Sequence, residues 1–379
     1  MALSLDFRHR GAVRLSHFCA IGCLLLLGLA LPVVAQQIND CDARDGLEPI
    51  CGLRGSEDLE VLPGGRQLIV SESQVRFDAK GYTNWLPSGL ALLDLSTRRP
   101  HEIYPAQAAR STDDNWGDPD CPDEIGARLS PHGIHLSRRD DHHWQLLVVN
   151  HGARESVEMF ELIGRGKETS VRWRGCVLAP PFAFLNDVAP LPGGGFVVTR
   201  YMDARRTIAA QRAEAGRDID TGYVLRWQPG GKLSEVPGTE APLPNGIQTT
   251  SDGRYMFVSV SGSHGEVRKY ELPGGRRIGA APVPHPDNLS WTSDGRLLAA
   301  GLQPVADLTG CFVDFERPCG AAFAIHAVDP VSLQSRQVFA HAGAPLGLAT
   351  VAVQAGNSLF VGSAAGDRVM RVPAADWRR

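Results

Sequence analysis

Pairs of acidic and amide residues stand directly before short apolar strands at four places in the chain. These pairs are Glu57-Asp58, Asn186-Asp187, Asn245-Gly246 and Asp287-Asn288, and the same interval separates each from a turn glycine, at Gly65, Gly194, Gly253 and Gly295. Two weaker copies, His132-Gly133-Ile134 and Leu346-Gly347-Leu348, keep the strand but change the turn. Carboxylates, amide oxygens and a histidine that converge on one point would form a site for a hard cation.

A repeated sheet is the element that would bring these residues together. The six copies begin at residues 57, 132, 186, 245, 287 and 346, a spacing long enough for a four-stranded antiparallel sheet in each repeat. Six such units predict an all-β fold, a six-bladed β-propeller with four antiparallel strands per blade. Its innermost strands surround a central channel, so the residue that opens each strand would face the axis. The residues expected to meet there are Glu57, His132, Asn186, Asn245 and Asp287.

The composition agrees with this architecture. The 379 residues include 41 glycines and 26 prolines with only 7% aromatics, as expected of many short strands joined by turns. A net charge of −4 argues against nucleic acid as a partner, and no Lys/Arg run points to an anionic membrane surface. We expect one propeller domain over residues 36–379, acting as a monomer on a small molecule.

The first 35 residues have the pattern of a signal peptide. Arg8, Arg10 and Arg14 precede an apolar run over 18–31, and Val33-Val34-Ala35 offers small residues for cleavage. The alternative is an uncleaved anchor, but this run is shorter than the ~20 residues that span a bilayer. We therefore expect cleavage after Ala35, no transmembrane span in the mature chain, and a secreted or periplasmic protein.

The cysteines support an oxidising compartment. Apart from two in the signal segment, six remain, an even number that predicts disulfides. Cys311 and Cys319 bracket a short loop and form the first expected pair, and Cys41 with Cys51 is the second. The sequence leaves the full connectivity open, because six cysteines allow fifteen pairings.

Two histidines and one helical segment stand out near the predicted site. His132 opens a strand and His151 ends the following one, so a β-hairpin would bring both imidazoles to the same end. A structural role for each histidine is the alternative to a functional one. Residues 201–221 contain the one good helix-forming stretch of the mature chain. This helix would cap the site as a lid or lie on the surface between strands.

At residues 131–162 the sequence resembles the paraoxonase/arylesterase family. The motifs are Pro131-His132-Gly133-Ile134, the segment LLVVNH over 146–151, and SVEMF over 156–160. The resemblance extends in order over about residues 55–301, through GSEDLEVLP at 55–63, LNDV at 185–188, NGI at 245–247 and DNL at 287–289.

This resemblance implies a six-bladed propeller with two calcium ions in its tunnel that hydrolyses lactones and aryl esters. Carried over by position, the catalytic calcium would be held by Glu57, Asn186, Asn245, Asp287 and Asn288. The structural calcium would be held by Asp58, Asp187 and the backbone carbonyl of Ile134. His132 and His151 match the family's histidine dyad. The chain departs from the family at 200–203 (RYMD, where the family has Asn-Asp-His), in its shorter and more charged lid region, and in having no cysteine after Cys319.

The predicted chemistry is metal-assisted ester hydrolysis. Calcium accepts 6–8 oxygens, so five protein groups leave room for a substrate carbonyl, which the ion would polarise. We expect His132, oriented by His151, to deprotonate the attacking water; Asp287 or Glu57 as base or nucleophile is the alternative. Two other functions stay open: a gluconolactonase-like sugar-lactone hydrolase with one metal, and a propeller that binds a ligand or protein without turnover. Turn-forming Asn-Gly pairs at blade junctions that bind nothing are the structural alternative.

Overall fold

The computed structural model describes residues 37–78, 80, 83–105, 115–140, 142–303, 311 and 315–377. The predicted signal segment, residues 1–35, lies outside these ranges. Among the described residues, no helix has the length and apolar character needed to cross a membrane.

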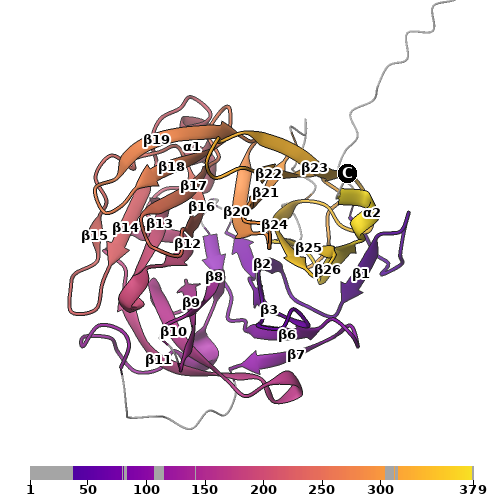
Figure 1. Ribbon diagram of the computed structural model, residues 1–379, viewed down its shortest axis with the longest axis horizontal. Coiled ribbons are helices and arrows are strands. Elements are labelled where there is room, and N and C mark those ends of the chain that lie inside the picture. Colours follow the sequence, from indigo (N-terminus) through magenta and orange to yellow (C-terminus); the bar gives the residue numbers. More distant parts are fainter. Residues whose placement is uncertain are drawn as a thin grey trace, which may run out of the picture. The chain divides into compact units, whose positions relative to one another are not determined.

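Six four-stranded antiparallel sheets form the blades of a β-propeller (Figure 1), which confirms the predicted fold. The strands of each blade are named from the innermost outwards. The first blade consists of β2 (Ser56–Val61), β3 (Gln67–Glu72), β6 (Leu90–Asp94) and β7 (Arg99–Tyr104), and the second of β8 (Pro131–Arg138), β9 (Trp144–Asn150), β10 (Ser156–Ile163) and β11 (Ser170–Leu178). The third blade consists of β12 (Ala183–Pro190), β13 (Phe196–Asp203), β14 (Tyr223–Trp227) and β15 (Ser234–Glu235).

The other three blades repeat this order. The fourth blade consists of β16 (Pro244–Thr249), β17 (Tyr255–Val260), β18 (Glu266–Glu271) and β19 (Arg276–Pro282), and the fifth of β20 (Pro286–Trp291), β21 (Leu297–Leu302), β22 (Phe323–Val328) and β23 (Ser335–His341). The sixth blade consists of β24 (Ala349–Ala355), β25 (Ser358–Ser363), β26 (Arg368–Val372) and β1 (Glu48–Cys51). Outside the blades lie the hairpin β4 (Val75–Phe77) and β5 (Thr83–Trp85), the helices α1 (Ile208–Ala215) and α2 (Ala374–Trp377), and three 3₁₀ turns, η1 (Gly126–Arg128), η2 (Gly166–Glu168) and η3 (Pro192–Gly194).

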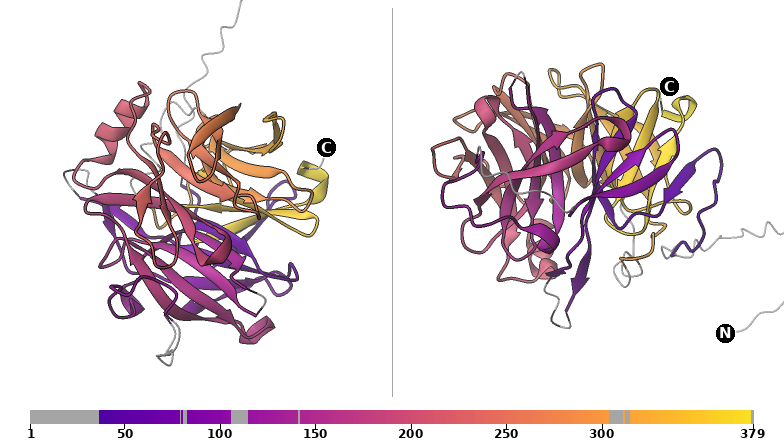
Figure 2. Two further views of the ribbon diagram at one scale, coloured as in Figure 1. Left: turned by 60° about the vertical axis from the view of Figure 1, so that its left-hand side comes forward. Right: turned by 90° about the horizontal axis from the view of Figure 1, so that it is seen from below.

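The ring is closed by a strand from the N-terminal part of the chain. β1 pairs antiparallel with β26, and Arg371 Nη1 lies 2.9 Å from Glu48 Oε2 across this pair. In the right-hand view of Figure 2, the indigo β1 lies beside the yellow strands of the sixth blade. This closure leaves no free edge where the ring joins.

Apolar side chains between neighbouring blades form the core. Ile69 and Leu92 of the first blade pack with Leu146 and Phe160 of the second, and all four are buried. Because each blade has a neighbour on both faces, its second strand is buried on both sides, as every residue of β3 is. Continuous apolar runs such as LIV at 68–70 follow from this double burial.

Three disulfides are present. The two expected pairs, Cys41–Cys51 and Cys311–Cys319, are found, and Cys121–Cys176 is a third that the sequence left open. This third bond joins the segment before β8 to the outermost strand of the second blade. Asp118 N–H also donates to the Cys176 carbonyl at 2.9 Å, so residues 115–121 cover the edge of β11.

Candidate active site

A local irregularity at the start of each innermost strand places the polar pairs at the channel. The pairing register shifts there in all six blades, between Ser56 and Asp58, Pro131 and Ile134, Leu185 and Val188, Pro244 and Ile247, Pro286 and Leu289, and Ala349 and Val351. Such a bulge bends the strand and re-aims its side chains. Both members of a pair can therefore turn towards the inside of the ring, which regular alternation would prevent.

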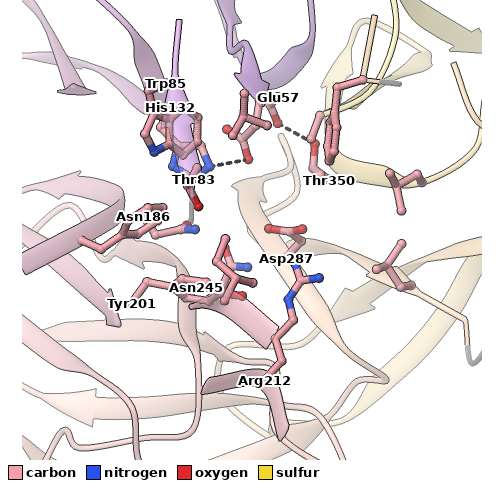
Figure 3. A pocket seen from close by; sticks show the side chains of 17 residues that line it. Glu57, Thr83, Trp85, His132, Asn186, Tyr201, Arg212, Asn245, Asp287 and Thr350 are labelled. Atoms are coloured by element: carbon pink, nitrogen blue, oxygen red, sulfur yellow. Dashed lines mark hydrogen bonds and ion pairs between the residues drawn. The ribbon is translucent and has the colours of Figure 1, made fainter. Parts of the chain in front are cut away.

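One pocket collects the first members of these pairs. Its lining includes Glu57, Asn186, Asn245, Asp287 and His132, and Figure 3 shows the labelled side chains directed into a common space. The space measures about 740 Å³ with its open mouth included. The remaining lining is largely apolar, from Trp85, Phe184, Ile208, Leu302 and Leu348 among others. The innermost strands thus bring together residues that lie up to 230 positions apart, from 57 to 287.

Four oxygen atoms at this place are buried and have no hydrogen-bond partner among the described residues. They are Glu57 Oε2 and the Oδ1 atoms of Asn186, Asn245 and Asn288. A buried acceptor without a partner costs about 1–3 kcal/mol and calls for an explanation such as an ion. The donor set is entirely oxygen, as a hard cation such as calcium prefers. Most of these oxygens belong to amide groups. Among the described residues, no group of three or more His, Cys, Asp and Glu side chains could hold a metal.

The Asp287 carboxylate carries an unfavourable charge when no cation is near. Burial first, and then the Glu57 carboxylate, raise the pKa of Asp287 to about 7. Asn288 lies behind the pocket wall, where its Nδ2 donates to Glu57 Oε1 at 2.9 Å and to the Glu57 carbonyl at 3.2 Å. The residues present therefore fit a cation at this place, with Asn288 holding the Glu57 carboxylate in position.

Asp58 and Asp187 form a second, deeper pair that does not line the pocket. Asp58 Oδ2 accepts from Ile134 N–H at 2.7 Å, and Asp187 Oδ2 accepts from Ile247 N–H at 2.8 Å, so each carboxylate reaches the neighbouring blade. Burial raises the pKa of both groups well above the usual value, and for Asp58 repulsion from Asp187 adds to it. Gly133 packs so close to Asp187 that no Cβ would fit there. Two buried carboxylates that repel each other also fit a cation between them.

The two histidines meet beside Glu57. His132 Nδ1 lies 3.0 Å from His151 Nε2, and His132 Nε2 lies 3.4 Å from Glu57 Oε1. At its other nitrogen, His151 Nδ1 lies 2.9 Å from Glu155 Oε2. If His151 donates to Glu155, its Nε2 accepts from His132 Nδ1–H, and the basic nitrogen of His132 is then Nε2, the one that faces Glu57.

Aromatic rings enclose this histidine pair. The His151 ring stacks against Trp85, at a centroid distance of 4.1 Å, and against Phe184, at 4.9 Å, and these two rings lie 5.8 Å from each other. Burial lowers the pKa of His151 more than Glu155 raises it. Burial also lowers the pKa of His132, but the carboxylates of Glu57, Asp287 and Asp187 together outweigh this effect, so the net pKa is raised. His132 is thus the more basic member of the pair.

Sequence reasoning missed several residues of the site. Glu155 orients His151 and also accepts from Leu185 N–H at 2.6 Å, and its position four residues after His151 was the available signal. Trp85 comes from the β4–β5 hairpin, and Arg212 comes from α1, in the segment expected to form a lid or a surface helix. The sixth copy of the repeat supplies Leu348 and Thr350, whose Oγ1 donates to the Glu57 carbonyl at 2.7 Å.

Comparison with known proteins identifies relatives of the chain. The model of the Arylesterase family matches residues 47–367. Human serum paraoxonase/arylesterase 1 is 25% identical over 240 residues, which span 62% of this chain and 60% of that protein. A gluconolactonase from Xanthomonas campestris superposes with a TM-score of 0.50 at 14% identity, covering 91% of this chain and 99% of that one. At this identity the structural likeness concerns the fold alone.

Proposed function

The chain belongs to the arylesterase family, and we propose that it is a calcium-dependent hydrolase of lactones and aryl esters. The observation that carries the proposal is the set of four buried, unpartnered oxygens beside the histidine pair, of which three belong to residues that line one pocket and the fourth belongs to Asn288 behind its wall. A calcium ion held there by Glu57, Asn186, Asn245, Asp287 and Asn288 would supply Lewis-acid polarisation of the substrate carbonyl. Asp58, Asp187 and the carbonyl of Ile134 would hold a second, structural ion.

His132 is the proposed general base. Its Nε2 would accept a proton from the attacking water, and the resulting positive charge would be stabilised by Glu57 at 3.4 Å. His151 holds the Nδ1 side of the ring, and Glu155 fixes His151 in turn. Trp85 and Phe184 exclude water from His151, so the proton stays on the pocket side.

A carboxylate is the alternative base. Asp287 lines the same pocket, and its pKa of about 7 without a cation is that of a group able to take up a proton near neutrality. Bound calcium would lower this pKa and favour Asp287 as a ligand, which supports His132 as the base. The presence of two separate oxygen clusters supports the two-ion arrangement over the single-metal, gluconolactonase-like one.

The compartment and the assembly state belong to the same proposal. We place the protein outside the cytoplasm, secreted or periplasmic, as a monomer acting on a small molecule. Three disulfides support an oxidising compartment. Identification of the N-terminal residue of the exported protein, together with its mass in solution, tests this part.

The experiment that tests the function is a metal-dependence assay over a panel of aryl esters, acyl lactones and sugar lactones. The purified chain is chelated, assayed, and supplied again with calcium, magnesium or zinc. We expect turnover of aryl esters and acyl lactones that is lost on chelation and restored by calcium. Equal turnover by the chelated chain would contradict the role of calcium, and turnover of sugar lactones alone would favour the gluconolactonase-like function. Tight calcium binding without hydrolysis of any substrate would favour a binding propeller.

A further inference from the structure

Arg212 extends from helix α1 towards the candidate site. In Figure 3 its guanidinium lies beside Asp287, on the opposite side of the pocket from His132. Burial raises the pKa of both Asp287 and the Tyr201 phenol, and the charge of Arg212 together with its hydrogen bond to Tyr201 partly offsets these rises. Among the described residues that line the pocket, Arg212 is the one with a permanent positive charge.

The helix that carries Arg212 is held firmly. Thr207 Oγ1 caps its first turn by accepting from Ala210 N–H at 3.3 Å. The neighbour of Arg212, Gln211, is completely buried, accepts from Asp203 N–H at 2.8 Å and donates to the Asp203 carbonyl at 3.0 Å. The Gln211 side chain thus ties α1 to the backbone at the end of β13, and this contact directs the neighbouring Arg212 side chain towards the pocket.

Arg212 also lies on the boundary between two compartments. The first is the pocket already described, with its aromatic wall of Trp85 and Phe184. The second lies beside it and shares Tyr201, Arg212, Asn245, Asp287 and Leu302 with the first. The residues that line it alone include four with polar side chains, Ser261, Ser263, His285 and Gln303, beside Gly216, Leu243 and Gly262. An ester placed at Asn245 and Asp287 would therefore have the aromatic wall of the first compartment on one side. On its other side it would have the second compartment, with its polar side chains and the guanidinium of Arg212.

We infer that Arg212 is a specificity-determining residue that selects esters and lactones whose acyl side carries a carboxylate. The aryl or other apolar group would lie against Trp85 and Phe184, and the carboxylate would enter the second compartment and bind Arg212. A guanidinium binds a carboxylate through two parallel N–H donors, and its five N–H groups allow it to contact Tyr201 and a ligand at the same time. The inference rests on the proposed ester hydrolysis and adds the substrate class.

The test compares two phenyl esters of similar length, anionic monophenyl glutarate and neutral phenyl hexanoate. The readout is the ratio of their kcat/KM values in the calcium-supplied wild type, in Arg212→Gln and in Arg212→Lys. A charge-assisted hydrogen bond at a partly exposed site predicts that Arg212→Gln lowers the anionic-to-neutral ratio about tenfold, and Arg212→Lys lowers it less. Added salt should reduce the wild-type preference. Arg206, which pairs with Glu214 and lines neither compartment, gives the matched control Arg206→Gln, whose ratio should equal that of the wild type.

Equilibrium binding separates this inference from the proposed function. Calorimetry with glutarate and pentanoate, two acids that differ by one carboxylate, should give a glutarate preference that is about tenfold smaller in Arg212→Gln. Equal ratios in the wild type and Arg212→Gln, in turnover or in binding, would overturn the inference. If the wild type hydrolyses neither ester, the proposed function fails, and the binding ratio alone decides the role of Arg212. A thermal unfolding curve of each variant confirms that it is folded.

Discussion

Glu57 connects the two parts of the candidate site at the level of single residues. Its Oε1 lies 3.4 Å from His132 Nε2 and accepts from Asn288 Nδ2, and its Oε2 is one of the four unpartnered oxygens. One carboxylate would therefore serve both as a metal ligand and as the partner of the base. Under the proposed function, metal binding and the basicity of His132 would be coupled through this side chain.

Replacement of His132 tests the assignment of the base. We expect His132→Gln to lower kcat by about 10²-fold or more, because general-base catalysis contributes about that much, while calcium binding is retained. The measurement is steady-state lactone and aryl ester hydrolysis at saturating calcium. His101→Gln, on the exposed part of β7, is the control and should behave as the wild type. Unchanged turnover in His132→Gln would move the assignment to a carboxylate.

Asn186 tests the explanation of the unpartnered oxygens. Leucine has nearly the same shape but no oxygen, so Asn186→Leu should weaken calcium binding and reduce the rise in unfolding temperature on calcium addition. Without calcium the variant should unfold at the same or a higher temperature, because a buried acceptor without a partner has been removed. At 100 times Kd, a ligand that binds only the folded state adds about 2.7 kcal/mol to its stability.

Asn357 provides the control for the Asn186 prediction. Asn357→Leu replaces an asparagine in an exposed turn and should leave the calcium effect unchanged. An equal calcium effect in Asn186→Leu and the wild type would mean that Asn186 Oδ1 is not a ligand. A variant that is less stable without calcium would show that Asn186 has a packing role.

At the level of the elements, the bulge in each innermost strand is the feature on which the site depends. It allows Glu57 to face the pocket while Asp58, its neighbour, reaches the next blade through Ile134 N–H. The same division of roles separates Asn186 from Asp187. The strands thus position two layers of oxygen groups with one repeated irregularity.

A buried histidine in β22 should make the stability of the protein depend on pH. His326 in β22 is buried, its Nδ1 has no partner among the described residues, and burial lowers its pKa below the usual value near 6.5. Below about pH 6.5 the unfolded chain takes up a proton that folded His326 resists, so stability falls as the pH falls. His326→Gln should therefore lose less stability than the wild type between about pH 7.5 and 5.5.

Thermal unfolding at constant calcium over this pH range provides the measurement. His264→Gln is the matched control, since the His264 side chain is 92% exposed, and it should follow the wild-type curve. An identical pH dependence of wild type and His326→Gln would show that the buried imidazole does not contribute.

At the level of the whole molecule, the ring depends on contacts between parts of the chain far apart in sequence. β1 closes the last blade, and the inner strands contact each other in a closed circle from β2 to β24. The disulfide Cys121–Cys176 adds a covalent link across 55 residues within the second blade. The polar centre of the ring is therefore supported by closure at its periphery.

The disulfides should differ in their contributions to stability. In the chain-entropy model, removal of Cys121–Cys176 costs about 4 kcal/mol, because its sequence separation is 55 residues. Removal of Cys41–Cys51, with a separation of 10, should cost less, under about 3 kcal/mol. Denaturant unfolding of the double alanine variants measures both. The reverse order would indicate that local contacts, and not loop entropy, dominate.

The sequence by itself determined the six-bladed ring and the positions of the polar pairs. Blade length fixes the period, and a polar pair before an apolar run marks the innermost strand, so both are local patterns. The approach of His132 to His151 followed from one hairpin, and the two short-range disulfides from short loops. Their chemical roles stay predictions, because the structure gives their positions and not their function.

Tertiary structure alone decided which side chains complete the site. Glu155, Trp85 and Arg212 reach it from a loop, a hairpin and a helix, and no periodic pattern marks them. The Cys121–Cys176 pairing likewise depends on how residues 115–121 pack along β11. The physical reason is that repeat spacing is set within each blade, whereas these contacts arise between segments whose approach depends on the packing of the whole ring.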